Sequence, residues 1–291
     1  MFEHLACEWG CKTDTVVTVF VTLSVFTIGI IINIIINNIR IFKERKRYRK
    51  YFHTIIKNLR KYSLRQSKEL DKSVLQFTME NQESYFVIQL TENSLNLIDK
   101  ISFEKIYDSF FAGLTYKNSL RMKALNCTLN QSALIKTING NIRTDIESLD
   151  KKFHNYEQSW NENIDSIRKI FDNLRQQNAS GTIKKEYIPL LRDLDKIISE
   201  WSHQTDRAHR VKVRQFIVEK LNSNFFEYHK TLEIATMIQN FNIEATMSYS
   251  NMENILELYA NLFRSYSRLH RNYYRIVGLS QRILIKTSLF K

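Results

Sequence analysis

Four arginines near the C-terminal end of the chain have the spacing of one helix face. Their steps are four, three and four residues, and the members are Arg264, Arg268, Arg271 and Arg275. His270, Tyr273 and Tyr274 occur among them, and the last 28 residues contain no acid. Guanidinium groups bind phosphates and aromatic rings stack on bases, so this arginine stripe indicates a site for an anionic, single-stranded oligonucleotide. A solvated charged face or contact with anionic lipid would explain the same pattern.

A smaller basic cluster lies about 50 residues earlier in the chain. It consists of Arg207, His209, Arg210, Lys212 and Arg214. If the helices that carry the stripe and this cluster were antiparallel neighbours, the two sets would line one cationic groove. The sequence therefore predicts a single anion site built from both.

No pattern typical of catalysis or metal binding accompanies these cations. The seven histidines form no H-E-x-x-H pair, and the phosphate-binding and dinucleotide-binding glycine motifs and the nucleophile elbow do not occur. The acids are dispersed among bases, as on the solvated surface of a helical bundle. We therefore expect no enzyme, no metal, no cofactor and no small-molecule substrate.

The N-terminal part contains a membrane-spanning pattern. Residues Thr15–Ile39 carry no charge and are rich in Val, Ile, Phe and Leu. At about 1.5 Å per residue these 25 residues exceed the roughly 30 Å hydrocarbon core. A buried core helix of this length would carry charges on one face, and a signal peptide would have a basic start and a shorter apolar run. The pattern therefore favours one transmembrane helix over 15–39.

Basic residues mark one side of this span. Lys12 alone precedes it, whereas ten basic residues against one acid occupy 40–61, a net charge of +9. The positive-inside rule places residues 1–14 outside and residues 40–62, a basic juxtamembrane helix, in the cytoplasm. Cys7 and Cys11 would then face an oxidising compartment, and Cys127 a reducing one.

The predicted span has a polar face. Its members recur at helical spacing and are Thr15, Thr18, Thr22, Gly29, Asn33 and Asn37. Amides in hydrocarbon are costly without partners, so this face should meet protein or water. Helix–helix packing and the lining of a water-filled pore both satisfy this requirement, and both imply a homo-oligomer.

The remaining residues, 63–291, predict a cytoplasmic helical bundle. Six glycines and one proline in 291 residues leave little material for turns, so the fold class is all-α with long helices. Apolar periodicity predicts helices over about 68–110, 135–174, from 182 or 188 to about 232, and 249–276. The second of these, 135–174, has a coiled-coil period, Gly181 is expected to end it, and Gly278 is expected to end the last.

The layout of an outside N-terminus, one span over Thr15–Ile39, the Arg40–Lys50 basic collar and a helical cytoplasmic sensor resembles the membrane effectors of bacterial anti-phage systems. It is most similar to the Hailong type, in which an oligodeoxyadenylate gates a membrane channel. The resemblance implies a ligand-gated pore in the bacterial inner membrane. The alternative is a membrane-tethered coiled-coil scaffold that recruits a partner. A third, weaker hypothesis is a toxin that disrupts the bilayer permanently.

Overall fold

The computed structural model describes residues 2–8, 10, 12–80, 102–111, 118–224, 228 and 231–286. Within these ranges the chain is built from helices and short connections, with no strand. One helix near the N-terminus contains a stretch long and apolar enough to cross a membrane, and none of that stretch is buried. The predicted all-α class with an apolar N-terminal helix is therefore confirmed.

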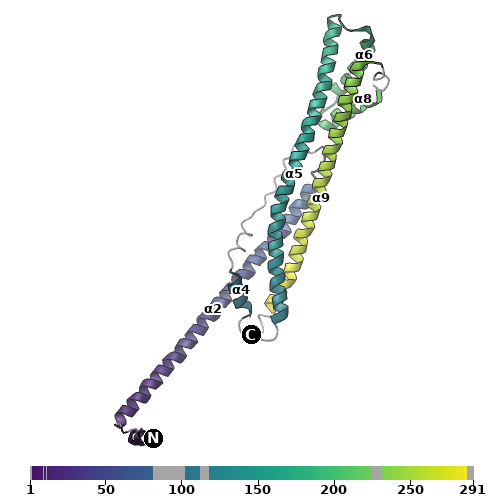
Figure 1. Cartoon of the computed structure of the whole chain (residues 1–291). Helices are drawn as coiled ribbons and strands as arrows, with labels where there is room; N and C mark the ends of the chain where they lie inside the picture. The colour runs from purple at the N-terminus through teal and green to yellow at the C-terminus, as the bar shows by residue number, and fades with distance from the viewer. Residues whose placement is uncertain are drawn as a thin grey trace. The chain divides into compact units, whose positions relative to one another are not determined.

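The described elements comprise three long helices and several short ones (Figure 1). The long helices are α2 (Thr13–Val74), α5 (Asn118–Ala179) and α9 (Glu233–Lys286). The short α-helices are α1 (Phe2–Glu8), α4 (Phe103–Phe111), α6 (Ile188–Ser202), α7 (Arg210–Val213) and α8 (Glu219–Asn224). A 3-10 turn, η1 (Lys185–Tyr187), precedes α6, and a π-helical segment, η2 (Arg214–Val218), joins α7 to α8.

The chain divides into two compact units. Unit 1 comprises Met1–Arg60, Glu92–Leu129 and Val277–Lys291, and unit 2 comprises Lys61–Thr91 and Asn130–Ile276. The division follows spatial proximity and not the order of the chain, so α2, α5 and α9 each contribute residues to both units. The two units are described separately below.

Helix α2 is longer than the sequence predicts. It continues without a break from Thr13 to Val74, past the expected end near residue 62, and residues 62–74 keep one buried face, formed by Ser63, Gln66, Ser67 and Leu70. The separate helix expected over 68–110 is therefore wrong at its start, since residues 68–74 belong to α2. Of its predicted apolar positions, Val87, Leu90, Leu95 and Ile98 lie outside the described residues.

In unit 1, buried side chains of α2 form the core just beyond the apolar stretch. Phe52, Ile56 and Leu59 are almost completely buried. The ring of Phe110 from α4 packs edge-on against Phe52, with 5.6 Å between centroids. Burial of such side chains contributes roughly 2 kcal/mol each, so this core holds α4 against α2.

The C-terminal end of α9 closes unit 1 through a glycine contact. Gly278 lies inside α9, so the prediction that it ends this helix is wrong. A Cβ atom at Gly278 would lie 2.5 Å from the guanidinium of Arg60, so the glycine leaves room for that side chain. Arg60 in turn donates to Gln281 Oε1 over 3.1 Å. The close approach of Arg60 accounts for a glycine inside a helix, where it normally costs about 1 kcal/mol.

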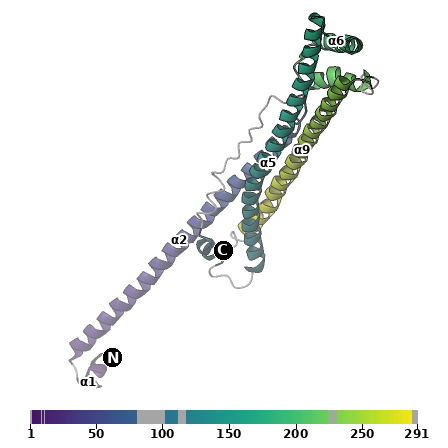
Figure 2. The same cartoon turned by 45° about the horizontal axis from the view of Figure 1, so that its top comes forward.

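In unit 2, α5 and α9 run side by side in opposite directions, as both views show (Figure 1, Figure 2). Contacts fix their register, since Ser132 pairs with Tyr273, whereas Ser159, almost four heptads later, pairs with Ser248. The predicted periodic face of α5 is the face that packs. Its side chains are buried at both ends of the stripe, including Ile142 and Leu174, and half-buried in the middle, as at Phe153.

Helix α5 ends where the sequence predicts. Gly181 has φ +69°, the left-handed conformation that favours glycine, and the backbone N–H of Thr182 donates to the carbonyl of Gln177 over 2.9 Å. Asn139-Gly140-Asn141, three residues with low helix propensity, are helical throughout.

The next two predicted helices differ from the observed ones. Helix α6 begins at Ile188 with Pro189 in its first turn, the second of the two starts considered. It ends at Ser202 and does not continue to about 232, because the polar residues 203–209 form turns. Helix α9 begins at Glu233, well before the expected 249.

Gly140, inside α5, and Gly181, just past its end, predict opposite effects on stability. Gly181→Ala should lower the melting temperature of the detergent-solubilised chain, because a Cβ at positive φ costs about 1 kcal/mol. Gly140→Ala should raise it, because alanine is the better helix former and its Cβ would meet no atom within 4 Å. Shifts of about 2–4 °C in either direction are expected in thermal denaturation monitored by circular dichroism. Equal shifts of the same sign would contradict the assigned helix end.

Candidate functional site

The arginine stripe lies on the exposed face of α9. All four of its side chains are exposed, whereas Phe263, Tyr266 and Tyr273 occupy the buried face of the same turns. The helical period that directs the aromatic residues into unit 2 therefore directs the arginines into solvent.

The four arginines differ in how far they are already engaged. Arg271 is paired with Asp71 of α2, and Arg264 donates to Asn261 Oδ1 over 3.0 Å. Arg268 and Arg275 have no ion-pair or hydrogen-bond partner in the described part of the chain. Of the four stripe arginines, these two have the most unsatisfied donors within the described residues, and they are seven residues apart on one face.

The aromatic residues among the arginines do not serve as stacking surfaces as the sequence predicts. His270 and Tyr273 are buried, and the hydroxyl of Tyr273 shares a 3.2 Å hydrogen bond with Ser132. Tyr274 is half-exposed. The rings recur among the arginines because the core repeats with the same period, so for His270 and Tyr273 the base-stacking interpretation is wrong.

The smaller basic cluster is largely neutralised by acids. Arg210 in α7 is paired with Glu157 of α5. Arg214, at the start of η2, lies 3.0 Å from Glu253, and its guanidinium stacks on the ring of Tyr249 at 4.3 Å. Burial lowers the pKa of Arg214, but Glu253 and Tyr249 outweigh this effect and the net pKa is raised. These arginines stabilise the packing of α7 and η2 on the α5–α9 pair.

The other members of the cluster also differ from the prediction. Arg207 lies in the turn between α6 and α7, not in a helix, and its carbonyl accepts a 2.8 Å hydrogen bond from the indole N–H of Trp201. Lys212 lies 5.9 Å above the ring of Phe216. The cluster is therefore a packing element with one exposed arginine.

The structure does not bring the stripe and the cluster into one groove. Arg214 contacts α9 at Tyr249 and Glu253. Arg268 follows Glu253 by 15 residues of the same helix, which is about 22 Å. The stripe is therefore a separate cationic surface.

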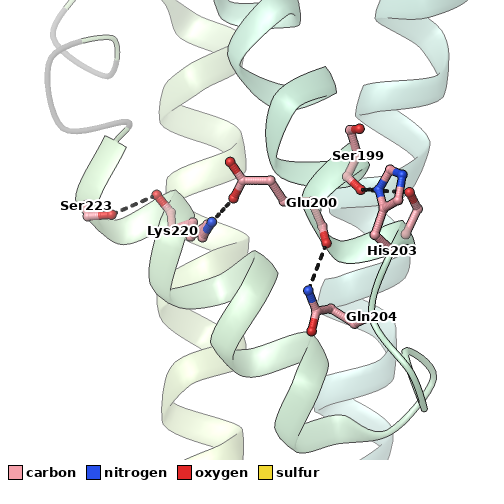
Figure 3. Close-up of polar contacts among 7 residues, drawn as sticks. Ser199, Glu200, His203, Gln204, Lys220 and Ser223 are labelled. Atoms are coloured by element: carbon pink, nitrogen blue, oxygen red, sulfur yellow. Dashed lines mark hydrogen bonds and ion pairs between the residues drawn. The ribbon is translucent and has the colours of Figure 1, made fainter.

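Polar contacts around α6 and α8 are structural. Figure 3 shows Lys220 of α8 paired with Glu200 of α6. Gln204 donates to the carbonyl of Glu200 over 3.3 Å, and His203 Nδ1 lies 2.6 Å from the carbonyl of Ser199. These side chains satisfy carbonyl groups that the last turn of α6 leaves free. No group of three or more His, Cys, Asp or Glu in the described residues has the geometry of a metal site.

The polar face of the apolar stretch of α2 separates into satisfied and unsatisfied groups. The hydroxyls of Thr18 and Thr22 donate to carbonyls one turn earlier, each over 2.8 Å. The exposed amides of Asn33 and Asn37 have no partner within the described residues. A Cβ at Gly29 would meet no atom within 4 Å, so packing inside the chain does not require this glycine. Thr15 is exposed as well.

Buried polar side chains from three helices occur in the core of unit 2. Ser63 and Gln66 from α2 are buried there, with Asn139 from α5 and His270 from α9. Asn139 donates to the hydroxyl of Tyr62 over 3.3 Å, but neither ring nitrogen of His270 has a hydrogen-bond partner in the part of the chain that the structure describes. The Tyr62 ring lies edge-on to His270 at 6.3 Å. Burial lowers the pKa of His270 to about 4, because the charged ring would lose its hydration.

Two tyrosines of α9 show how other polar groups in unit 2 are satisfied. Tyr266 donates to Asp145 over 2.6 Å, and Tyr259 donates to Asp150. Burial and the nearby carboxylates raise the pKa of both hydroxyls. The sequence analysis did not find these pairs, since their members are more than 100 residues apart and no local pattern relates them.

Comparisons of the chain with protein-family models, with curated proteins and with solved structures found no match.

The buried His270 predicts a pH-dependent stability. Its pKa is lowered from 6.5 to about 4, so the unfolded chain takes up this proton first as the pH falls. The free energy of unfolding is therefore unaffected by the titration of His270 above pH 6.5. It decreases progressively as the pH falls from 6.5 towards 4, because only the unfolded chain is protonated there. A difference of about 2.5 pKa units corresponds to about 3 kcal/mol.

His270→Leu should remove this part of the pH dependence. Urea denaturation of the solubilised chain at pH 7.5 and pH 4.5 measures it. His154→Gln, a change at an exposed histidine of α5, is the matched control and should leave the dependence unchanged. A wild-type slope that His270→Leu does not reduce would contradict the buried, neutral state of this ring.

Proposed function

We propose that this protein is a homo-oligomeric, ligand-gated membrane pore, with Asn33 and Asn37 on its polar face. The observation that carries the proposal is that both amides lie exposed, without partners among the described residues, on a helix apolar enough to cross a membrane. A lone helix in lipid would leave both amides unsatisfied at a cost of several kcal/mol each. Neighbouring copies, or water enclosed by them, remove that cost.

The orientation of the proposed pore follows from charge. Residues 40–61 carry a net charge of +9, whereas residues 1–14 carry −2. Under the positive-inside rule the helical body lies in the cytoplasm of a bacterium and the N-terminus lies outside the inner membrane. The ligand then reaches the arginine stripe from the cytoplasm.

The proposed ligand is an anionic oligonucleotide bound along the arginine stripe. Arg268 and Arg275 supply unengaged guanidinium groups, and Arg264 and Arg271 flank them on the same face. The burial of His270 and Tyr273 shifts the expected recognition from bases to phosphates, so affinity should depend strongly on salt and weakly on sequence. The layout-level resemblance to anti-phage effectors favours an oligodeoxyadenylate as the first probe.

Helix α9 carries the arginine stripe and also contacts α2 near its C-terminal end. Its stripe ends at Arg275, and three residues later Gly278 lies against the Arg60 side chain of α2. Gln281, one turn further, accepts from Arg60 and also donates to the carbonyl of His53 over 3.4 Å. A ligand that binds α9 in one conformation better than in another would shift these contacts with α2.

A scaffold is the second candidate function. Ile243, Met247 and Leu258 are exposed on one face of α9, and the middle of the α5 stripe is only half-buried. These apolar side chains favour a further helix as a partner. A scaffold predicts an oligomer that forms without conductance and survives charge reversal in the arginine stripe.

Charge reversal at the two unengaged arginines tests the ligand site. Arg268→Glu with Arg275→Glu should weaken binding of a fluorescein-labelled oligodeoxyadenylate by roughly tenfold or more. It should also reduce the slope of log K against log salt by about 1.4, since each phosphate contact to a single strand contributes about 0.7. Fluorescence anisotropy over a salt series measures both quantities.

Lys152→Glu with Lys169→Glu is the matched control, because these exposed lysines of α5 change the net charge equally. Binding that the control weakens as much as the arginine variant would assign the effect to overall charge. Failure of the wild-type chain to bind the probe would refute the ligand assignment.

Loss of the two amides tests the pore. Asn33→Leu with Asn37→Leu should abolish ion flux through the protein in liposomes, because the polar face would lose its amides. Thr27→Val is the control, since that hydroxyl donates within its own helix over 2.7 Å and lies off the polar face. Unaltered flux in the double variant would show that the asparagines only pack.

A further inference from the structure

The short helix α4 of unit 1 exposes an aromatic edge. Phe103 is 54% exposed and Tyr107 is 42% exposed, whereas Phe111, one turn further, is 6% exposed. The three rings follow one another along the helix, with centroid separations of 6.2 Å and 4.8 Å. Large apolar rings that remain exposed while the rest of their helix is packed indicate contact with something outside the chain.

Side-chain contacts fix where α4 lies along α2. Arg45 of α2 forms a two-pronged ion pair with Asp108, with both N–O distances at 3.0 Å. The C-terminal end of α4 lies beside Phe52, through Phe110. The N-terminal end lies in the opposite direction along α2, where Glu104 shares the wall of an open cavity of about 270 Å³ with Ile41. Phe103 therefore begins α4 at the level of residues 41–44.

This level coincides with the edge of the apolar stretch. Ile41 follows Ile39 by two residues, about 3 Å, and Arg45 follows it by six, about 9 Å. The headgroup region occupies roughly 5–8 Å beyond each side of the hydrocarbon core. Aromatic side chains concentrate at this depth in membrane proteins, because their rings are amphipathic. Phe42, 60% exposed on α2, lies at the same depth.

We infer that α4 is a membrane-surface helix whose Phe103 and Tyr107 side chains insert into the headgroup layer of the bilayer that α2 crosses. The inference rests on the proposed span, because its depth is counted from Ile39. The carboxylates of α4 do not oppose insertion, since Asp108 is neutralised by Arg45 and Glu104 neighbours Lys105. Exposed lysines at positions 43 and 46 of α2 add attraction for anionic lipid.

Arg45 and Asp108 have a positioning role in this arrangement. Their two-pronged geometry holds α4 at one height along α2 and in one orientation. Because the pair fixes α4 relative to α2, the depth of α2 in the bilayer also determines the depth of the Phe103 and Tyr107 side chains. A shift of α2 along its axis would move Phe103 and Tyr107 out of the headgroup layer, so α4 opposes such a shift.

Site-directed fluorescence quenching in nanodiscs tests the inference with the full chain. Cys7, Cys11 and Cys127, the three cysteines of the chain, are replaced by serine, and a bimane label is attached at Phe103→Cys. Phe42→Cys is the positive control. Leu279→Cys is the negative control, because Leu279 is 61% exposed and adjoins Gly278, which lies beside Arg60 about 32 Å past Ile39.

Lipids that carry a doxyl group near the headgroup should quench the label at Phe103→Cys about as strongly as at Phe42→Cys, and several times more than at Leu279→Cys. Asp108→Arg should reduce quenching at Phe103→Cys, and Arg45→Asp with Asp108→Arg should restore it. Quenching at Phe42→Cys without quenching at Phe103→Cys would overturn the inference alone, in favour of a protein covering α4. Absence of quenching at both positions would overturn the proposed span as well.

Discussion

A polar group that leaves water must find a partner, and this constraint organises both ends of the molecule. In the apolar part of α2 the threonine hydroxyls obey it locally, because a carbonyl lies one turn away. An asparagine amide presents more donors and acceptors than its own helix can supply, so in the proposed membrane span Asn33 and Asn37 require groups from elsewhere. In unit 2, Tyr259 and Tyr266 obey the constraint through aspartates of α5. His270 is the exception, since neither of its ring nitrogens has a partner among the described residues and burial keeps the ring neutral.

The positive charge of the chain divides into parts with different physical roles. The net charge is +13, but the body between the basic collar and the C-terminal stripe is nearly neutral. Within the collar, Arg45 positions α4. Within the body, Arg210 and Arg214 are engaged with acids and a tyrosine ring. Two arginines of the stripe remain unengaged in the described residues, and the ligand hypothesis depends on these two.

Periodic and capping signals predicted much of the fold. The α5 stripe, the turn at Gly181 and the start of α6 near Pro189 all follow from local rules, which operate within one or two helical turns. The prediction that Gly278 ends a helix is wrong, because the residue that requires a glycine there, Arg60, is more than 200 residues away in the chain. The prediction that His270 and Tyr273 stack on bases is wrong for a similar reason, because their burial depends on helices from distant parts of the chain. Spacing identifies which residues share a face, but only packing decides which face is buried.

The amides of Asn33 and Asn37 have a consequence for how the protein would behave in a cell. If their partners come from other copies of the chain, satisfying them is an act of assembly and follows mass action. The fraction of chains in complete assemblies then rises as a steep power of their density in the membrane. A modest change in the synthesis or turnover of the protein would therefore change the fraction of assembled chains greatly. The expression level would thus limit the number of complete assemblies that a ligand could act on.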